Sequence, residues 1–405
     1  MIKIRNNIFF RILFLLLIFI INVSYSPVFF DSEGLSIFPF KWVIELLAVL
    51  FLMLSLFFRC PQTKFIWHYL IFAIIITATV LLYYSLDLNV SLGEIREILI
   101  PFMALTAGSY IFKYHGDYLF LRTIFFVSIV SALIVGLQQI FINIGGFSIN
   151  EQYLTNSKNS LGGILAINTI LASLELFGLY KKSLSYIVFL SISIIVLILE
   201  MLTIRSRLDL IVSFFLLFVI FLRYLNYRNS KYKVISAFVL VFLLLALLSI
   251  SSVQDYIQSS FLLNREDDVL SGRYERIEKA LEILSFRPFS GNLFIFEYVP
   301  WVHNYFLLKI SSFGLFFGLP WIVFYLYIFA FIIGRLYRNK SISLYSYGIY
   351  LTLIPFLISL GEPTYPFGPG TVNYLPYLLL GFSLEYMQSA DSDNYPSERD
   401  VLPKI

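Results

Sequence analysis

A histidine and two arginines share the one long polar stretch of a very apolar chain. Arg273 and Arg276 lie within this stretch, and His303-Asn304 follows where a long apolar segment begins. Histidine can give or take a proton near neutral pH. Arginine stays charged, and its planar group donates paired hydrogen bonds that suit phosphate. These residue types make the stretch the first candidate for a functional site.

The position of His303 at the start of an apolar segment predicts its surroundings. If a helix includes the histidine, His303, Leu307, Ile310 and Gly314 share one stripe at 100° per residue. Glycines at 314 and 318 are expected to serve packing, because small residues let another helix approach closely. A titratable side chain on such a face is a site hypothesis. The alternative is an interfacial histidine with a satisfied hydrogen bond, and position alone leaves both open.

A second cationic feature lies between two apolar segments. Arg205 and Arg207 precede Asp209 at what is expected to be the outer end of both segments. Their guanidinium groups are suited to phosphate. The alternative is that they reach toward lipid headgroups while their stems cover apolar surface.

An amphipathic helix is predicted after Ser271, which suits the N-cap position. Its apolar stripe is expected to comprise Ile277, Ala280, Leu281 and Leu284. Arg273 lies about 30° from the centre of that stripe, and Arg276 lies about 90° away at its margin. An arginine on a buried stripe needs an anionic partner or a polar cavity. The alternative for Arg273 is a surface salt bridge with Glu275 or Glu278.

Other charged residues in the apolar segments are expected to form internal ion pairs, because isolated charges are costly in a membrane. These residues are Glu45, Glu94, Arg96, Glu97 and Glu200.

No metal or other cofactor is expected. Cys60 is the only cysteine, the three histidines are scattered, and no nucleotide-binding pattern occurs. Asp267-Asp268 could hold a cation, but a solvated charge run is the favoured interpretation.

The composition indicates which elements must position these residues. The chain has 405 residues, of which 59% are hydrophobic and 13% charged, and its mean hydropathy is +0.84. No soluble globular domain has this composition. Whole segments are apolar, which favours helices over an alternating β-barrel. With roughly 20 residues per span, about twelve spans are predicted. They are 8–25, 37–58, 65–86, 95–112, 119–143, 160–180, 184–204, 208–225, 234–252, 305–334, 344–361 and 373–387.

The basic residues predict the orientation. With the N-terminus inside, most Lys and Arg residues of the short loops fall on the inner side, so both termini are expected there. The first apolar segment lacks a small-residue cleavage site and is interpreted as an uncleaved helix. Residues 1–387 are expected to form a single all-α transmembrane domain that includes a long outer loop at 253–304. Residues 388–405 are expected to be a disordered inner tail, and the net charge of +4 reflects the inner loops rather than nucleic-acid binding.

Several motifs together resemble those of the O-antigen polymerase and ligase superfamily. The long loop contains Ser271-Gly-Arg273, then Arg287-Pro-Phe-Ser-Gly291, then His303-Asn304 before a glycine-containing helix. Ser206-Arg207 fits the family's Ser-Arg at the outer start of a span, and Asn156–Asn159 fits its Asn-containing segment. The family often has a second glycine after Pro-x-x-Gly, where this chain has asparagine.

The resemblance implies a metal-independent glycosyl transfer at the periplasmic face of the bacterial inner membrane. The donor would be a glycan on undecaprenyl diphosphate, and the acceptor would be a sugar hydroxyl. Arg207 and Arg273 would hold the diphosphate and stabilise the departing charge. His303 would accept or orient the hydroxyl proton. The substrate-binding residues would be Arg205, Arg276, Arg287, Asn304 and Tyr274.

The resemblance favours a polymerase of O-antigen or a related surface polysaccharide in lipopolysaccharide biosynthesis. Both of its substrates would be lipid-linked oligosaccharides, and its further partners would be membrane lipids and a chain-length regulator protein. One alternative is an O-antigen ligase, which would need a basic outer groove for the lipid A–core. Another is a flippase, which would carry cations within its central spans.

Overall fold

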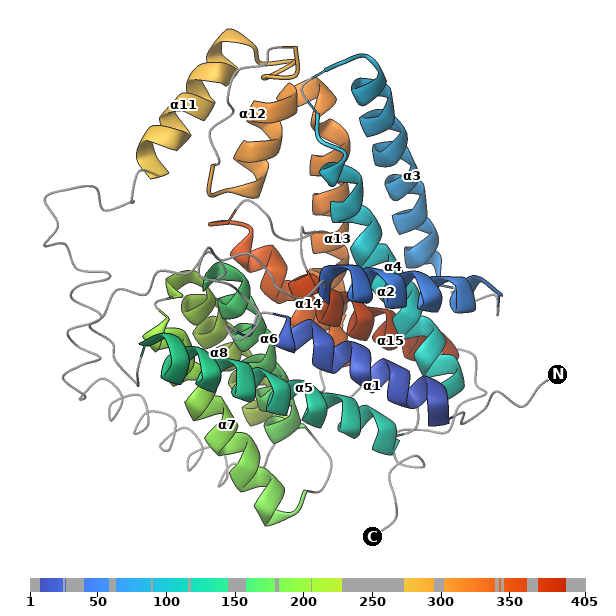
Figure 1. Cartoon of the computed structure of the whole chain (residues 1–405), viewed down its shortest axis with the longest axis vertical. Helices are drawn as coiled ribbons and strands as arrows, with labels where there is room; N and C mark the ends of the chain where they lie inside the picture. The colour runs from blue at the N-terminus through green and yellow to red at the C-terminus, as the bar shows by residue number, and fades with distance from the viewer. Residues whose placement is uncertain are drawn as a thin grey trace, which may run out of the picture.

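The structure is a computed structural model, and all of its regular secondary structure within the described residues is helical (Figure 1). It describes residues 8–24, 26, 40–57, 63–88, 90–115, 118–144, 158–178, 182–204, 206–227, 273–294, 302–338, 342–343, 346–362 and 371–390. The predicted all-α class is therefore confirmed for these residues.

Within the described part of the chain, seven helices are long and apolar enough to cross a membrane. They are α3 (Lys64–Ser85), α4 (Gly93–His115), α5 (Tyr118–Gln138), α6 (Lys158–Phe177), α7 (Leu184–Thr203), α8 (Arg207–Tyr227) and α13 (Leu319–Arg338). Shorter apolar helices are α1 (Ile8–Val23), α2 (Phe40–Phe57), α12 (Tyr305–Phe317) and α14 (Tyr347–Ile358). The chain is thus a membrane-embedded helical protein. The predicted segment 234–252 lies outside the described residues, and the count of twelve spans stays a prediction.

Two predicted regions are described only in part. The long outer loop contains helix α11 (Arg273–Phe286) and a turn at 287–294, and its residues 253–272 and 295–301 lie outside the described residues. The last helix, α15 (Tyr374–Ala390), continues past the domain boundary predicted at 387. The rest of the predicted tail, 391–405, lies outside the described residues.

Glycines bring α15 into close contact with its neighbours α4 and α14. A Cβ atom on Gly108 of α4 would lie 1.9 Å from the carbonyl oxygen of Leu378, and one on Gly381 would lie 2.0 Å from that of Leu105. Gly348 of α14 approaches the backbone of α15 from another helix in the same way. Small residues allow such contacts between membrane helices. As a result, α15 is buried along most of its length.

A buried polar network joins α1, α5 and α6. The Asn22 amide donates to Ser131 Oγ at 2.8 Å, and Ser128 Oγ donates to Asn168 Oδ1 at 2.7 Å. All four side chains are at most 1% exposed. Buried polar groups require partners, so this network helps to set the relative positions of the three helices.

The predicted single span at 305–334 is wrong in one respect, because the structure divides it into α12 and α13. Gly314 has φ 73° and ψ 175°, which interrupts the helix, and α13 starts only at Leu319. A positive φ of this kind is open to glycine at little cost. Hydrophobic periodicity does not register such a break, because both sides of it remain apolar.

Candidate functional site

The N-terminus of α12 is attached to the C-terminal end of α14. The Asn304 side chain caps α12, since its Oδ1 accepts from the Leu307 N–H at 3.0 Å. Its Nδ2 donates to the carbonyl oxygen of Leu360 at 3.1 Å. The Tyr305 N–H also donates to the carbonyl oxygen of Ser359, at 3.0 Å. These contacts favour a positioning role for Asn304 over direct sugar binding.

His303 does not lie on the helical stripe that the sequence predicts, because the helix begins after the Asn304 cap. Instead its ring is held between two charged side chains from distant parts of the chain. Nε2 lies 3.2 Å from a terminal guanidinium nitrogen of Arg276, and Nδ1 lies 3.2 Å from Glu362 Oε2. The His303 side chain is 20% exposed and that of Glu362 is 9% exposed. The imidazole is therefore oriented but still reachable.

The two contacts indicate the tautomer of the His303 ring, that is, which of its nitrogens carries the hydrogen. Arginine has only donors, so Nε2 is the nitrogen that accepts from Arg276. Nδ1 then carries the hydrogen and donates it to the carboxylate of Glu362. A carboxylate accepts the Nδ1 hydrogen, and Nε2 keeps its lone pair. The histidine of a Ser-His-Asp triad has the same arrangement when it acts as a general base.

Arg276 is nearer to the centre of the site than the sequence predicts. The prediction put it at the margin of the apolar stripe of α11, whereas it lies four residues before the fully buried Ala280 and reaches His303. Leu281, expected in the stripe, is instead 54% exposed. The packed face of α11 thus centres on its smallest apolar residue, where α12 can approach closely.

The turn after α11 and the break in α12 meet through backbone atoms, and we call this contact the glycine seam. Gly291 and Gly314 both have positive φ, 54° and 73°. A Cβ atom on Gly314 would lie 2.3 Å from the carbonyl oxygen of Phe289. The Leu315 N–H donates to the carbonyl oxygen of Pro288 at 2.8 Å. Gly314 therefore serves packing as predicted, but against a turn rather than another helix.

The start of α8 lies beside the C-terminal end of α14. Ser206 Oγ donates to Asp209, and a Cβ atom on Gly162 of α6 would lie 2.1 Å from that hydroxyl oxygen. A Cβ atom on Gly361 would lie 2.9 Å from Leu208 Cδ2. Since Gly361 precedes Glu362, the Ser-Arg segment adjoins the residues that orient His303.

The remaining predicted site residues differ in what the structure describes. Arg207 and Arg287 are partly exposed, and neither pairs with an acid within the described residues. Arg205 lies outside the described residues, as do the side chains of Arg273 and Tyr274. Helix α11 begins at Arg273. This residue lies seven positions before Ala280, which places it on the same face of the helix as Arg276.

A buried ionic cluster holds α12 against α4 below the site. Lys309 Nζ contacts Glu94 and lies 2.9 Å from Glu97 Oε2, and the lysine side chain is 2% exposed. The ion pairing predicted for Glu94 and Glu97 is confirmed, and so is that of Arg96 with Glu45.

Glu200 departs from the same prediction. It is fully buried in α7, and within the described residues neither of its carboxylate oxygens has a hydrogen-bond partner. Its neighbour on α5 is Gly136, where a Cβ atom would lie 2.0 Å from Glu200 Oε2. A glycine rather than a cation faces this carboxyl group, which explains why the predicted ion pair is missing there.

Fold and site define a class: a membrane-embedded helical protein with a carboxylate–histidine–arginine cluster at the start of α12. No protein-family model and no curated protein matches the sequence.

Proposed function

We propose that this protein is a glycosyltransferase, namely a polymerase that joins lipid-linked repeat units of O-antigen or a related surface polysaccharide. The observation that carries the proposal is the placement of His303 between Glu362 and Arg276. This arrangement combines a base with a phosphate-binding cation. The motif resemblance to the O-antigen polymerase and ligase superfamily supplies the substrate class.

The proposed reaction exchanges one bond at the anomeric carbon of the donor glycan. A hydroxyl of the non-reducing sugar on one lipid-linked unit attacks the carbon that joins the growing chain to undecaprenyl diphosphate. The new glycosidic C–O bond forms while the C–O bond to the diphosphate breaks with its electron pair. His303 Nε2 takes the hydroxyl proton. Undecaprenyl diphosphate leaves as an anion, and Arg207 and Arg273 stabilise its charge.

The contact between Arg276 and His303 couples donor binding to the base. In the structure the guanidinium occupies the lone pair of Nε2. An entering diphosphate offers this guanidinium an anionic acceptor in place of a neutral ring, and an arginine–phosphate pair can form two parallel hydrogen bonds with opposite charges, whereas the ring accepts only one. Donor binding therefore draws Arg276 away and exposes Nε2 to the acceptor hydroxyl.

The proposal also includes the finer topology. The basic residues favour twelve spans with both termini on the cytoplasmic side. His303 then faces the periplasm from the bacterial inner membrane, on the side where lipid-linked repeat units would be joined.

Deletion of this gene from its host tests the proposal. A polymerase-null strain should keep single repeat units on its surface lipid and lose the ladder of longer chains, and the wild-type gene should restore the ladder. Loss of the single units as well, with long chains accumulating on undecaprenyl diphosphate, would identify a ligase. Accumulation of single units on the cytoplasmic face would identify a flippase.

Replacing Arg273 with lysine should remove most of the polymer. A lysine is a point charge and cannot donate the paired hydrogen bonds of a guanidinium. The measurement is ladder length in the complemented deletion strain, with membrane levels of the protein matched. Lys279→Arg, at an exposed position of the same helix, is the control and should behave as wild type. Wild-type ladders from Arg273→Lys would remove Arg273 from the site.

Replacing Glu362 with glutamine should slow turnover about 10²-fold, at the lower end of what general-base catalysis contributes. The amide keeps the shape of the side chain but loses the charge that stabilises the imidazolium formed when Nε2 takes a proton. Because Glu362 acts through His303, kcat should fall while KM for the lipid-linked unit stays unchanged in an assay on purified protein.

The exposed Glu278→Gln on α11 is the matched control for this variant. A rise in KM with unchanged kcat would instead make Glu362 a substrate-binding residue.

A further inference from the structure

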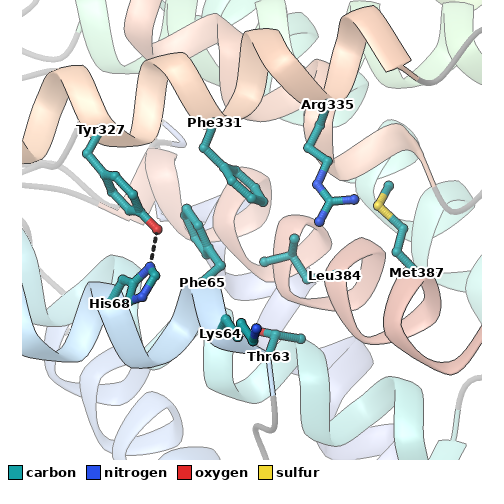
Figure 2. Close-up of a pocket in the computed structure, with 9 residues that line it drawn as sticks. All are labelled: Thr63, Lys64, Phe65, His68, Tyr327, Phe331, Arg335, Leu384 and Met387. Carbon is teal, nitrogen blue, oxygen red and sulfur yellow. Dashed lines mark hydrogen bonds between the residues drawn. The ribbon is translucent and has the colours of Figure 1, made fainter. Parts of the chain in front are cut away.

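A pocket lies at the end of α13 that is remote from His303. It is formed by the start of α3 and the ends of α13 and α15, and its volume is about 360 Å³ (Figure 2). Arg335, which lines the pocket, comes 16 residues after Leu319 and so lies about 24 Å along the helix from it. The pocket is therefore separate from the proposed catalytic site.

Two cations give the pocket its charge. Lys64 is the first residue of α3, and Arg335 lies in the last turn of α13. No acidic residue is among the described residues that line the pocket. Within the described part of the chain, neither cation pairs with an acid. The pocket thus offers two positive charges without internal compensation.

An apolar wall lies directly beside these cations. Phe65 and Phe331 stack with ring centroids 4.2 Å apart, and Leu384 and Met387 of α15 complete the wall. The guanidinium of Arg335 lies 5.3 Å from the centroid of the Phe331 ring. Figure 2 shows Arg335 extending from α13 between Phe331 and Met387. Cations above an apolar wall suit a ligand with an anionic head and a hydrocarbon tail.

A polar pair marks the opposite edge of the pocket. His68 Nδ1 and the Tyr327 hydroxyl lie 2.6 Å apart and face each other away from Arg335 (Figure 2). His68 is one helical turn from Lys64, and Tyr327 is about two turns from Arg335. This pair can hydrogen-bond to ester or glycerol oxygens that the two cations leave unpaired.

We propose that this pocket binds an anionic phospholipid of the surrounding leaflet. Its phosphate pairs with Lys64 and Arg335, and an acyl chain lies along Phe65 and Phe331. Both cations lie at a helix end, where a headgroup meets the hydrocarbon region. The orientation favoured by the basic residues makes this the cytoplasmic leaflet. The proposal does not depend on the glycosyltransferase assignment.

The test measures the thermal stability of the purified protein in detergent with three separate additives. Phosphatidylglycerol should raise the melting temperature. Phosphatidylcholine with the same acyl chains should raise it much less, and inorganic phosphate should leave it unchanged. Equal stabilisation by both lipids would overturn the proposal in favour of a general apolar contact. Stabilisation by inorganic phosphate alone would overturn it in favour of a small-anion site.

Paired variants test the residues themselves. Lys64→Ala with Arg335→Ala should weaken phosphatidylglycerol binding about 10- to 30-fold, as expected for the loss of two interfacial cations. Lys113→Ala with Arg338→Ala removes two exposed basic residues that do not line the pocket, and it should bind normally.

A charge-preserving pair guards against loss of folding. Lys64→Arg with Arg335→Lys should keep the preference for phosphatidylglycerol. Loss of that preference in this pair, or its survival in the alanine pair, would refute the assignment of the two cations.

Discussion

Replacing His303 with alanine should abolish the polymer while the protein still inserts and accumulates normally. In the proposed reaction, Nε2 of His303 accepts the hydroxyl proton. General-base catalysis of this kind accelerates a reaction by about 10² to 10⁴. The structure adds a reason to expect normal folding. The contacts that attach α12 to α14 come from the Asn304 side chain and the Tyr305 N–H, and alanine at position 303 removes neither of them.

The measurement is the ladder in the complemented deletion strain, together with turnover on purified lipid-linked units. His115→Ala is the control, because His115 ends α4. The end of α4 that contacts Lys309 is its other end, about 30 Å away along the helix. An ordinary ladder from His303→Ala at normal protein levels would assign the base to another residue.

Replacing Lys309 with methionine should strongly destabilise the protein. Methionine fits the space, but Glu94 and Glu97 then face each other without their cation in a buried setting. Removing one partner of a buried ion pair costs about 3–5 kcal/mol. The melting temperature in detergent should fall clearly, and less protein should accumulate in the membrane.

A compensating variant separates this charge effect from packing. Adding Glu94→Gln and Glu97→Gln to Lys309→Met neutralises the whole cluster and should recover most of the lost stability. Lys113→Met, at an exposed position of α4, should be close to wild type. A stable Lys309→Met protein would mean that the acids are neutral or reached by water without the lysine.

Long apolar segments made the helical class predictable, because a membrane helix needs an unbroken apolar run. The break at Gly314 was not predictable in the same way. Its cause is the docking of the turn after α11, and the backbone atoms that dock there leave no mark in hydrophobic periodicity. The prediction that Gly314 packs closely was correct, but the partner is a turn and not another helix.

Short motifs in the sequence marked His303 and Arg276, which the structure brings together. Glu362 was missed because it lies 59 residues after His303, before a segment rich in proline and glycine, and no motif links the two residues. Its carboxylate reaches the histidine only through the attachment of α12 to α14. Lys309 was missed since a single cation inside an apolar run gives no sign of which acids it will meet.

The glycine seam has a consequence for how such chains can diverge. Its hydrogen bonds join backbone to backbone, and two side chains beside it, those of Phe289 and Phe316, are 69% and 67% exposed. Because a Cβ atom at Gly291 or Gly314 would meet backbone atoms, we expect these two positions to tolerate less change than the exposed Phe289 and Phe316. A related chain could therefore keep this junction while few of its other residues are the same. A search for two glycines at this spacing before and after a His-Asn pair should find chains that overall similarity overlooks.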